Sequence, residues 1–241
     1  MSARLQAPGR LYLVPNLLGI VPPDAVLPQR TIDIARGLRH FVVETPKVAR
    51  QFLKTLGSRH ALAALLLSEL NEHTPTGAIE PLLGPAVSGE DLGMLSDAGC
   101  PGIADPGSAL VAAAHRVGIL VVPLVGPSAL LLGLMASGMN GQAFAFHGYL
   151  PAKPGPRAIA LKSLERELAR TGATQIFIEA PYRNETMVDA VLSNCAPATR
   201  LCVAIDLTLP SEQIISQSVG AWRKHTRAAV AKRPAIFLLG R

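Results

Sequence analysis

Cysteine and aromatic residues are scarce in this sequence of 241 residues. Its three cysteines, Cys100, Cys195 and Cys202, are odd in number and form no Cys-x-x-Cys pair. Such a sparse set excludes a disulfide framework and is typical of proteins in the reducing cytosol. Residues 1–15 also lack an apolar segment long enough for a secretory signal peptide. We therefore expect a cytoplasmic protein.

Several motifs that would mark common enzyme classes are missing. The six histidines are scattered, and no His/Cys group has the spacing of a zinc site, so we expect no metal. The sequence contains neither a Walker loop nor a dinucleotide fingerprint. A serine hydrolase is the alternative of a different class, but the Gly-x-Ser-x-Gly elbow of α/β hydrolases is absent.

Charged residues make up only 17% of the chain, and the balance is mildly basic. The formal net charge is +6 and the pI is about 9.6. This balance is compatible with RNA as a partner, because phosphate neutralisation by Lys and Arg dominates nucleic-acid affinity. The basic residues concentrate only in the ranges 151–157 and 222–233, and aromatic residues for base stacking make up 4%. A solvated basic face would give the same pattern.

One long run, residues 117–146, carries no charge and resembles a membrane span by hydropathy. Pro123 and the Gly126-Pro127-Ser128 triplet divide this run, however. The pieces have the lengths of a buried strand, a turn and a core helix. We therefore expect no membrane segment.

Apolar runs typical of strands alternate with segments of helical period along the whole chain. The expected strands are 10–15, 40–44, 92–97, 118–125, 144–150, 174–180, 201–207 and 235–240. The clearest helical segments are 47–56, 108–117 and 157–170. Near-continuous apolar strands favour parallel sheets covered on both faces. We predict an α/β protein with two open α/β domains, residues 1–124 and 125–241, divided near the Gly-Pro turn.

The loop within "MLSDAGCPGIADPG", residues 94–107, is rich in Gly, Pro and Asp and follows an expected strand. Ligands of open α/β sheets bind outside the carboxyl ends of the strands. Gly99 and Gly102 permit close backbone approach, while Asp97 and Asp105 offer hydrogen-bond acceptors. Both aspartates also suit a purely structural role as turn or cap formers.

The residues of this loop resemble the signature of a known protein family. "LSDAGCPGIADPG" is similar to the signature of the tetrapyrrole methylase-like superfamily, in the form found in bacterial ribosomal RNA small-subunit 2'-O-ribose methyltransferases. The resemblance continues in order through "GRLYLVP", "VVPLVGPSALLLGLMASG", "FHGYLPAKPGPR", "IFIEAPYR" and "EQIISQSVGAW". It implies S-adenosylmethionine bound in a cleft between the two domains, and a homodimer.

The resemblance also implies which residues bind the cofactor. Main-chain groups of the loop, together with positions of "GPSA" and "IFIEAPYR", would surround it. These residues are Asp97, Gly99, Cys100, Ile103, Asp105, Ser128, Ala129, Glu179 and Ala180. Two of them have an alternative interpretation, since Ser128 is a good helix N-cap and Cys100 suits a small buried apolar site.

The substrate side matches the family pattern less well. Where the ribosomal methylases have Thr-Pro-Ile-Gly-Asn, this chain has "PNLLGIVPP", and "ETPKVAR" lacks an aspartate and a histidine of the family pattern. The implied substrate residues that remain are Glu44, Lys47, Arg50, Asn71, Glu72 and His73. A ribose hydroxyl would benefit from a base, for which Glu44, Glu72 and His73 are candidates, and none is singled out.

The hypothesis is therefore an S-adenosylmethionine-dependent methyltransferase that acts on the ribose 2'-hydroxyl of small-subunit ribosomal RNA. Two alternatives stay open. The acceptor could be a tetrapyrrole or another small molecule, or the chain could be a cofactor-binding homologue without catalytic activity.

Overall fold

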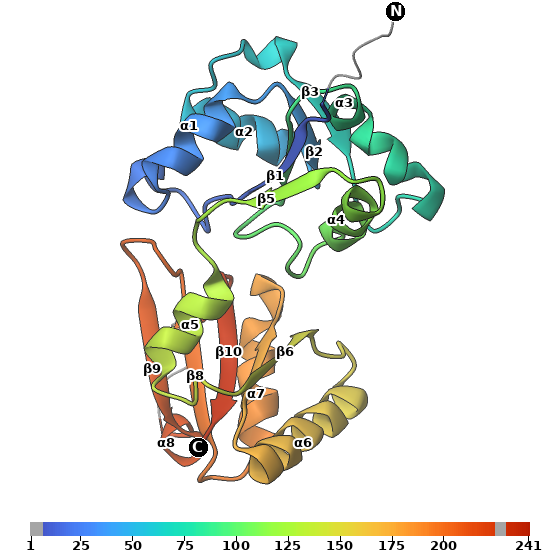
Figure 1. Cartoon of the computed structure of the whole chain (residues 1–241). Coiled ribbons are helices and arrows are strands. Elements are labelled where there is room, and N and C mark those ends of the chain that lie inside the picture. The colour runs from blue at the N-terminus through green and yellow to red at the C-terminus, as the bar shows by residue number, and fades with distance from the viewer. Residues whose placement is uncertain (1–6, 225–229) are drawn as a thin grey trace, which may run out of the picture. The chain divides into compact units, whose positions relative to one another are not determined.

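The computed structural model describes residues 7–224 and 230–241 and divides the chain into two compact units (Figure 1). Unit 1 comprises Met1–Ser128 and unit 2 comprises Ala129–Arg241. The sequence placed this division after Leu124. Residues 225–229, which belong to the basic stretch 222–233, lie outside the described residues.

Unit 1 contains a five-stranded sheet in the order β3-β2-β4-β1-β5, in which every pair is parallel. Its strands are β1 (Arg10–Val14), β2 (His40–Val43), β3 (Leu66–Glu69), β4 (Leu92–Leu95) and β5 (Leu120–Pro123). The sequence predicted all of these strands except β3. That strand lies at the edge of the sheet, and its burial pattern is largely exposed, so it lacks the apolar run on which the prediction depended.

Both faces of this sheet are buried, because successive side chains of a strand point to opposite faces. Tyr12 and Val14 of β1 belong to one core cluster, while Leu11 belongs to another. The first cluster includes residues of α1 (Gln29–Gly37) and α2 (Pro46–Leu56). The second includes residues of α3 (Gly84–Val87) and α4 (Gly107–Arg116). The unit is therefore a parallel sheet covered by helices on both sides, as predicted.

Unit 2 contains a second five-stranded sheet, in the order β6-β7-β10-β8-β9. Its strands are β6 (Phe144–Tyr149), β7 (Thr174–Ile178), β8 (Arg200–Ile205), β9 (Gln213–Ser218) and β10 (Ala235–Gly240). Only β6 and β7 pair in parallel, so the expectation of parallel strands is wrong for this unit. The connection 206–212 is too short for a parallel crossover, and it joins β8 to β9, a strand that the sequence analysis did not predict.

Helices cover both faces of this mixed sheet. They are α5 (Ala129–Ser137), α6 (Pro154–Thr171), α7 (Asn184–Asn194) and α8 (Val219–Trp222). Buried residues of α6 and α7 pack against Phe177 and Phe237 in one cluster. On the opposite face, visible in front in Figure 1, α5 lies so close to the sheet that a Cβ atom at Gly133 would stand 2.8 Å from Ile236 Cγ2. Short 3-10 helices complete the described elements: η1 (Pro23–Ala25), η2 (Leu62–Ala64), η3 (Thr76–Ala78), η4 (Glu80–Leu83) and η5 (Pro181–Arg183).

The uncharged run 117–146 folds as β5, α5 and the start of β6, with the Gly-Pro turn between strand and helix, as the sequence predicted. Among the described residues, no helix has both the length and the apolar character needed to cross a membrane.

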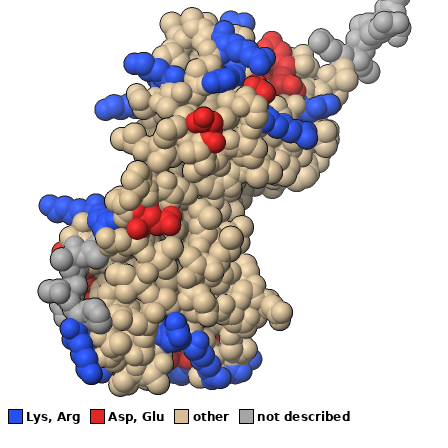
Figure 2. Space-filling model, turned by 90° about the vertical axis from the view of Figure 1, so that its left-hand side faces the viewer, with Lys and Arg blue, Asp and Glu red and all other residues tan. Residues whose placement is uncertain are grey.

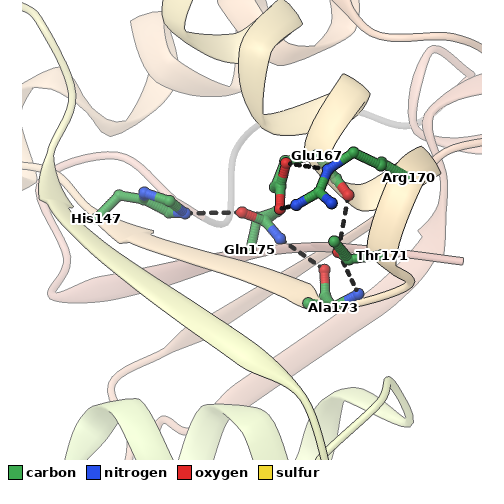
Figure 3. Close-up of polar contacts among 6 residues, drawn as sticks. All are labelled: His147, Glu167, Arg170, Thr171, Ala173 and Gln175. Carbon is green, nitrogen blue, oxygen red and sulfur yellow. Dashed lines mark hydrogen bonds and ion pairs between the residues drawn. The ribbon is translucent and has the colours of Figure 1, made fainter.

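Hydrogen bonds fix the end of α6 to the parallel pair β6 and β7 (Figure 3). The Thr171 hydroxyl donates to the Glu167 carbonyl at 2.8 Å and accepts from the Ala173 N–H at 3.1 Å. The side chain of Gln175, fully buried in β7, donates to the Ala173 carbonyl at 2.7 Å, and its Oε1 lies 2.8 Å from His147 Nε2 of β6. Since α6 runs back between two parallel strands, its N-terminus lies at their carboxyl ends.

We expect Phe237→Ala to destabilise unit 2 by about 3–5 kcal/mol, because the change leaves a cavity in the core. Phe237 is fully buried, and its ring stacks on Phe177 with centroids 5.4 Å apart. Urea unfolding followed by the fluorescence of Trp222, the chain's one tryptophan and a residue of unit 2, measures the loss. Phe144→Ala, at a side chain that is 42% exposed, is the control, with an expected loss below about 1 kcal/mol.

Candidate functional site

The candidate site lies in unit 1, at the edge of the sheet where its parallel strands end. Strands β1, β2 and β4 are neighbours in the order β2-β4-β1, so their carboxyl ends adjoin. The segments that follow them, 15–22, 44–45 and 96–106, therefore come together although they are far apart in the sequence. This is the place where open α/β sheets bind ligands.

The loop after β4 has a backbone shape that depends on glycine. Gly99 has a φ of 68°, in the left-handed region, and a Cβ atom there would stand 3.3 Å from Leu18 Cδ2. The same atom would lie 3.6 Å from the Pro127 carbonyl oxygen. A larger residue would be strained and would close the space between the segments that follow β1, β4 and β5. The loop main chain is therefore close to its neighbours because position 99 has no side chain.

Asp97 joins the loop after β4 to the segment after β2. Its carboxylate accepts hydrogen bonds from the Thr45 N–H at 3.1 Å and from the Thr45 hydroxyl at 2.8 Å. In the opposite direction, the Asp97 N–H donates to Glu44 Oε2 at 3.2 Å. These reciprocal bonds place Glu44 and Asp97 together at the ends of β2 and β4.

Asn16, which the sequence analysis did not select, joins the same loop to the segment after β1. Its side chain is 4% exposed and donates to the Ser96 carbonyl at 3.1 Å and the Asp97 carbonyl at 3.0 Å. Its backbone N–H donates to the Gly99 carbonyl at 2.9 Å. The signal in the sequence was a polar residue placed just after an apolar strand, but its partners lie about 80 residues away.

Asp105 closes the loop on itself. Its carboxylate accepts from the Gly102 N–H at 2.9 Å and from the Gly107 N–H, at the start of α4, at 2.7 Å. Burial raises the pKa of this carboxyl above its usual value, and the two backbone bonds act against the rise. Asp105 therefore has the structural role that the sequence left open, and its role toward a ligand stays a prediction.

Glu44 is a half-buried carboxyl group in a depression that Ser96, Asp105 and Gly107 also line. Burial raises its pKa above the usual 4.5, and the nearby charges of Asp97 and Asp105 act in the same direction. The bond from the Asp97 N–H lowers the pKa but is outweighed. Glu44 therefore holds a proton more tightly than an exposed glutamate does.

Cys100 and Ile103 present different surfaces of the loop. The Cys100 thiol is half-buried and lies 3.5 Å from the Pro127 carbonyl oxygen, and burial raises its pKa above 9.0. Ile103 is 49% exposed. It offers apolar surface beside main-chain donors and acceptors.

A pocket of about 670 Å³ opens between the segment after β1 and helix α2. Asn16, Leu18, Lys47, Phe52 and Asp97 are among its lining residues. The pocket is mainly apolar, with the charged groups of Lys47 and Asp97 in its lining. Its volume suits a small molecule or a nucleotide.

The other predicted substrate residues lie outside this pocket. Arg50 is exposed on α2 and is absent from the pocket lining. Asn71 forms a turn after β3, in which its Oδ1 accepts from the His73 N–H at 2.9 Å. The side chains of Glu72 and His73 are 85% and 84% exposed. The structure therefore brings Glu44 and Lys47 to the strand-end site and leaves Glu72 and His73 on the solvent side.

The remaining predicted cofactor residues belong to the junction and to unit 2. Ser128 ends unit 1 and Ala129 begins α5. Glu179 follows β7, and its Oε1 accepts from the Ala180 N–H at 2.8 Å and from Arg183 Nη2 at 2.6 Å. Its Oε2 is buried and has no hydrogen-bond partner among the described residues. This oxygen can accept one more hydrogen bond.

Charge is spread thinly over the molecule. Lys and Arg side chains are scattered over the face in Figure 2, with broad uncharged areas between them. In the described part of the chain, no group of three or more His, Cys, Asp or Glu residues could hold a metal ion. The arrangement at the strand ends is suited to binding a small molecule through main-chain groups and a few carboxylates.

Comparison of the sequence with curated proteins finds relatives that share one name. The chain is 32% identical to the ribosomal RNA small subunit methyltransferase I of Escherichia coli O157:H7 over 219 residues, which is 90% of this chain and 72% of that protein. It is 31% identical to the Synechocystis protein of the same name, over 92% of this chain and 73% of that protein. No family model matches the chain.

Solved structures share the fold. The methyltransferase CobJ is 20% identical with a TM-score of 0.64, over 97% of this chain and 94% of that one. The uroporphyrin-III C-methyl transferase of Thermus thermophilus, complexed with S-adenyl homocysteine, is 18% identical with a TM-score of 0.55, over 97% and 98%. The predicted tetrapyrrole methylase-like fold is thereby confirmed.

We expect the stability of Glu44→Gln, relative to the unaltered protein, to increase as the pH rises from about 4 to 7. The pKa of Glu44 is higher in the folded protein than its usual value of 4.5, so this carboxyl group stabilises the folded state at low pH. That stabilisation is lost as the pH rises through the pKa of the folded protein. Glutamine avoids the loss and can still accept from the Asp97 N–H. Thermal unfolding at several pH values measures the difference. With Glu72→Gln, at an exposed side chain, the difference should not vary with pH; a flat profile for Glu44→Gln would contradict the burial effect.

Proposed function

Because this chain belongs to the ribosomal RNA small subunit methyltransferase I family, we propose that it transfers a methyl group from S-adenosylmethionine to a ribose 2'-hydroxyl of small-subunit ribosomal RNA. The chain is a methyltransferase by family, as its sequence predicted, and RNA is its expected acceptor. The observation that carries the proposal is the loop 96–106, whose predicted cofactor residues lie at the strand ends where such folds bind ligands.

The residues present fit the cofactor. S-adenosylmethionine combines a zwitterionic amino acid with a ribosylated purine, so it needs backbone donors and acceptors, apolar surface and a few polar side chains. The loop offers its main chain at Gly99 and Cys100 and exposed apolar surface at Ile103. The cofactor, when bound, supplies an activated methyl group on its sulfonium.

The protein must then align the acceptor and remove its proton. Of the three candidate bases, Glu44 is half-buried at the strand-end site, while Glu72 and His73 are exposed. A carboxyl group whose pKa is raised is a better general base than an exposed one, because its pKa lies nearer to neutral. We therefore favour Glu44 as the group that accepts the proton and Lys47, in the pocket lining, as a contact for RNA phosphate.

We extend the proposal to a homodimer in the cytoplasm, as the family resemblance implies. Helix α5 supports self-association, since Leu131 and Met135 are 51% and 78% exposed on the unit that holds them. Large exposed apolar side chains that lie near one another favour burial against a partner surface.

We expect Gly99→Val to abolish cofactor binding, since the added side chain would be strained and would approach Leu18 and Pro127. Calorimetric titration with S-adenosylhomocysteine measures binding, and saturation at a hundredfold excess over Kd should stabilise the unaltered protein by about 2.7 kcal/mol. Gly77→Val is the control, because a Cβ at Gly77 meets nothing within 4 Å and its φ is ordinary. Normal binding by a folded Gly99→Val variant would remove the loop from the site.

We expect labelled methyl groups to enter the RNA of small ribosomal subunits that lack the modification, and not porphyrin precursors. Lys47→Ala should weaken RNA binding and reduce the slope of log K against log salt by roughly 0.7–0.9, one phosphate contact, with cofactor affinity unchanged. Lys54→Ala, also exposed on α2 but outside the pocket lining, is the matched control.

Methylation of the porphyrin fraction alone would replace RNA with a tetrapyrrole acceptor. Methylation of neither substrate, with cofactor binding intact, would identify a non-catalytic homologue or a different acceptor.

A further inference from the structure

Arg157 is a buried cation without a counter-ion. It belongs to α6, and only 5% of its surface is exposed. Its Nε has no hydrogen-bond partner, and none of the described residues accepts from its guanidinium or forms an ion pair with it. On the helix it occupies the stripe that continues with Leu161, Leu164 and Leu168, so it stands where the pattern would place an apolar residue.

Two acidic groups of unit 2 that are withdrawn from solvent are paired. Glu179 is matched by Arg183 at 2.6 Å, and Asp206 is matched by Arg233 at 2.8 Å. Removing a guanidinium from water without an acceptor is strongly unfavourable, so buried charges are nearly always paired or neutralised. Arginine cannot lose its proton at physiological pH. The exception at Arg157 therefore points to an anion that comes from outside the chain.

The surroundings of Arg157 suit an anion. Helix α6 has 18 residues, and its first turn contains no acidic residue. Lys153 is its N-cap residue and is exposed. The helix dipole places partial positive charge at this end, and long side chains of helix residues lie over the preceding turn. Arg157 and Lys153 are therefore two cationic residues of the first turn, in which Pro154 and Pro156 carry no N–H.

We propose that Arg157 and Lys153, in the first turn of α6, bind a backbone phosphate of the RNA acceptor. The proposal rests on the function proposed above. The planar guanidinium can donate two parallel hydrogen bonds to phosphate oxygens, and lysine adds a mobile point charge. RNA is a polyanion with phosphate at every residue, so this site in unit 2 adds a contact to those expected in unit 1. The carboxylate of the cofactor is the competing anion, and the experiment separates the two.

The test compares Arg157→Met with Arg166→Met in the full chain. Both variants lose one positive charge from α6, but Arg166 is on the exposed side and no ion pair involves it among the described residues. Arg157→Met should weaken binding of small-subunit ribosomal RNA about tenfold and reduce the salt slope by about 0.7–0.9. The melting temperature of the free protein should stay equal or rise, since an unpaired buried charge is replaced by an apolar side chain. Arg166→Met should change RNA affinity less than about twofold, and both variants should bind S-adenosylhomocysteine normally.

A second variant, Arg157→Lys, keeps the charge without the guanidinium fork. It should retain the salt slope and lose part of the RNA affinity, which also tests the proposal if Arg157→Met does not fold. A lower melting temperature with unchanged RNA affinity in both variants would make Arg157 a structural residue. Lost binding of S-adenosylhomocysteine with unchanged RNA affinity would assign the anion to the cofactor. If the unaltered protein binds no RNA, the proposed acceptor fails as well, whereas equal binding by Arg157→Met overturns this inference alone.

Discussion

The candidate site depends on the hydrogen bonds of a single residue, Asp97. Its carboxylate holds Thr45, its N–H holds Glu44, and its carbonyl accepts from the side chain of Asn16. Thr45 and Glu44 follow β2, Asn16 follows β1 and Asp97 itself follows β4, so one residue connects the segments after three strands. Parallel strands cannot be joined by tight hairpins, so segments at their carboxyl ends are far apart in the sequence and meet through side-chain and backbone hydrogen bonds such as these. Asp97 thus fixes the start of the glycine loop, while Asp105 and the backbone N–H of Asn16 hold the rest of it.

The sequence predicted most of the fold because burial on both sides of a strand leaves an apolar run that is visible locally. The uncharged run 117–146 divided into strand, turn and helix where Pro123 and Gly126 indicated. The edge strand β3 escaped prediction because exposure removes that run. The antiparallel order in unit 2 was missed because β9, whose burial alternates little, was not recognised. Strand direction follows from the length of the connection, which could be judged only once both strands were known.

The part of the candidate site that consists of a local sequence motif was predictable. The part that depends on contacts with main-chain groups far away in the sequence was not. The loop around Gly99 was visible as a cluster of Gly, Pro and Asp. Asn16 was not, because an asparagine after a strand becomes informative only when the carbonyls that it contacts are known. Arg157 stood within a segment that looked merely basic, and its burial distinguishes it from the exposed cations of the same helix. Sequence patterns report average solvent exposure better than they report individual polar contacts.

The protonation state of the Cys100 thiol affects how readily it could react with a methyl donor. A thiolate is the strongest nucleophile among ordinary side chains, and a sulfonium methyl donor is an alkylating agent. Burial keeps the pKa of this thiol above 9.0, so at neutral pH it stays protonated. In a loop proposed to hold such a donor, a protonated thiol competes poorly with the intended acceptor. The same burial that packs the loop against the Gly-Pro turn therefore further lowers the thiolate fraction of Cys100.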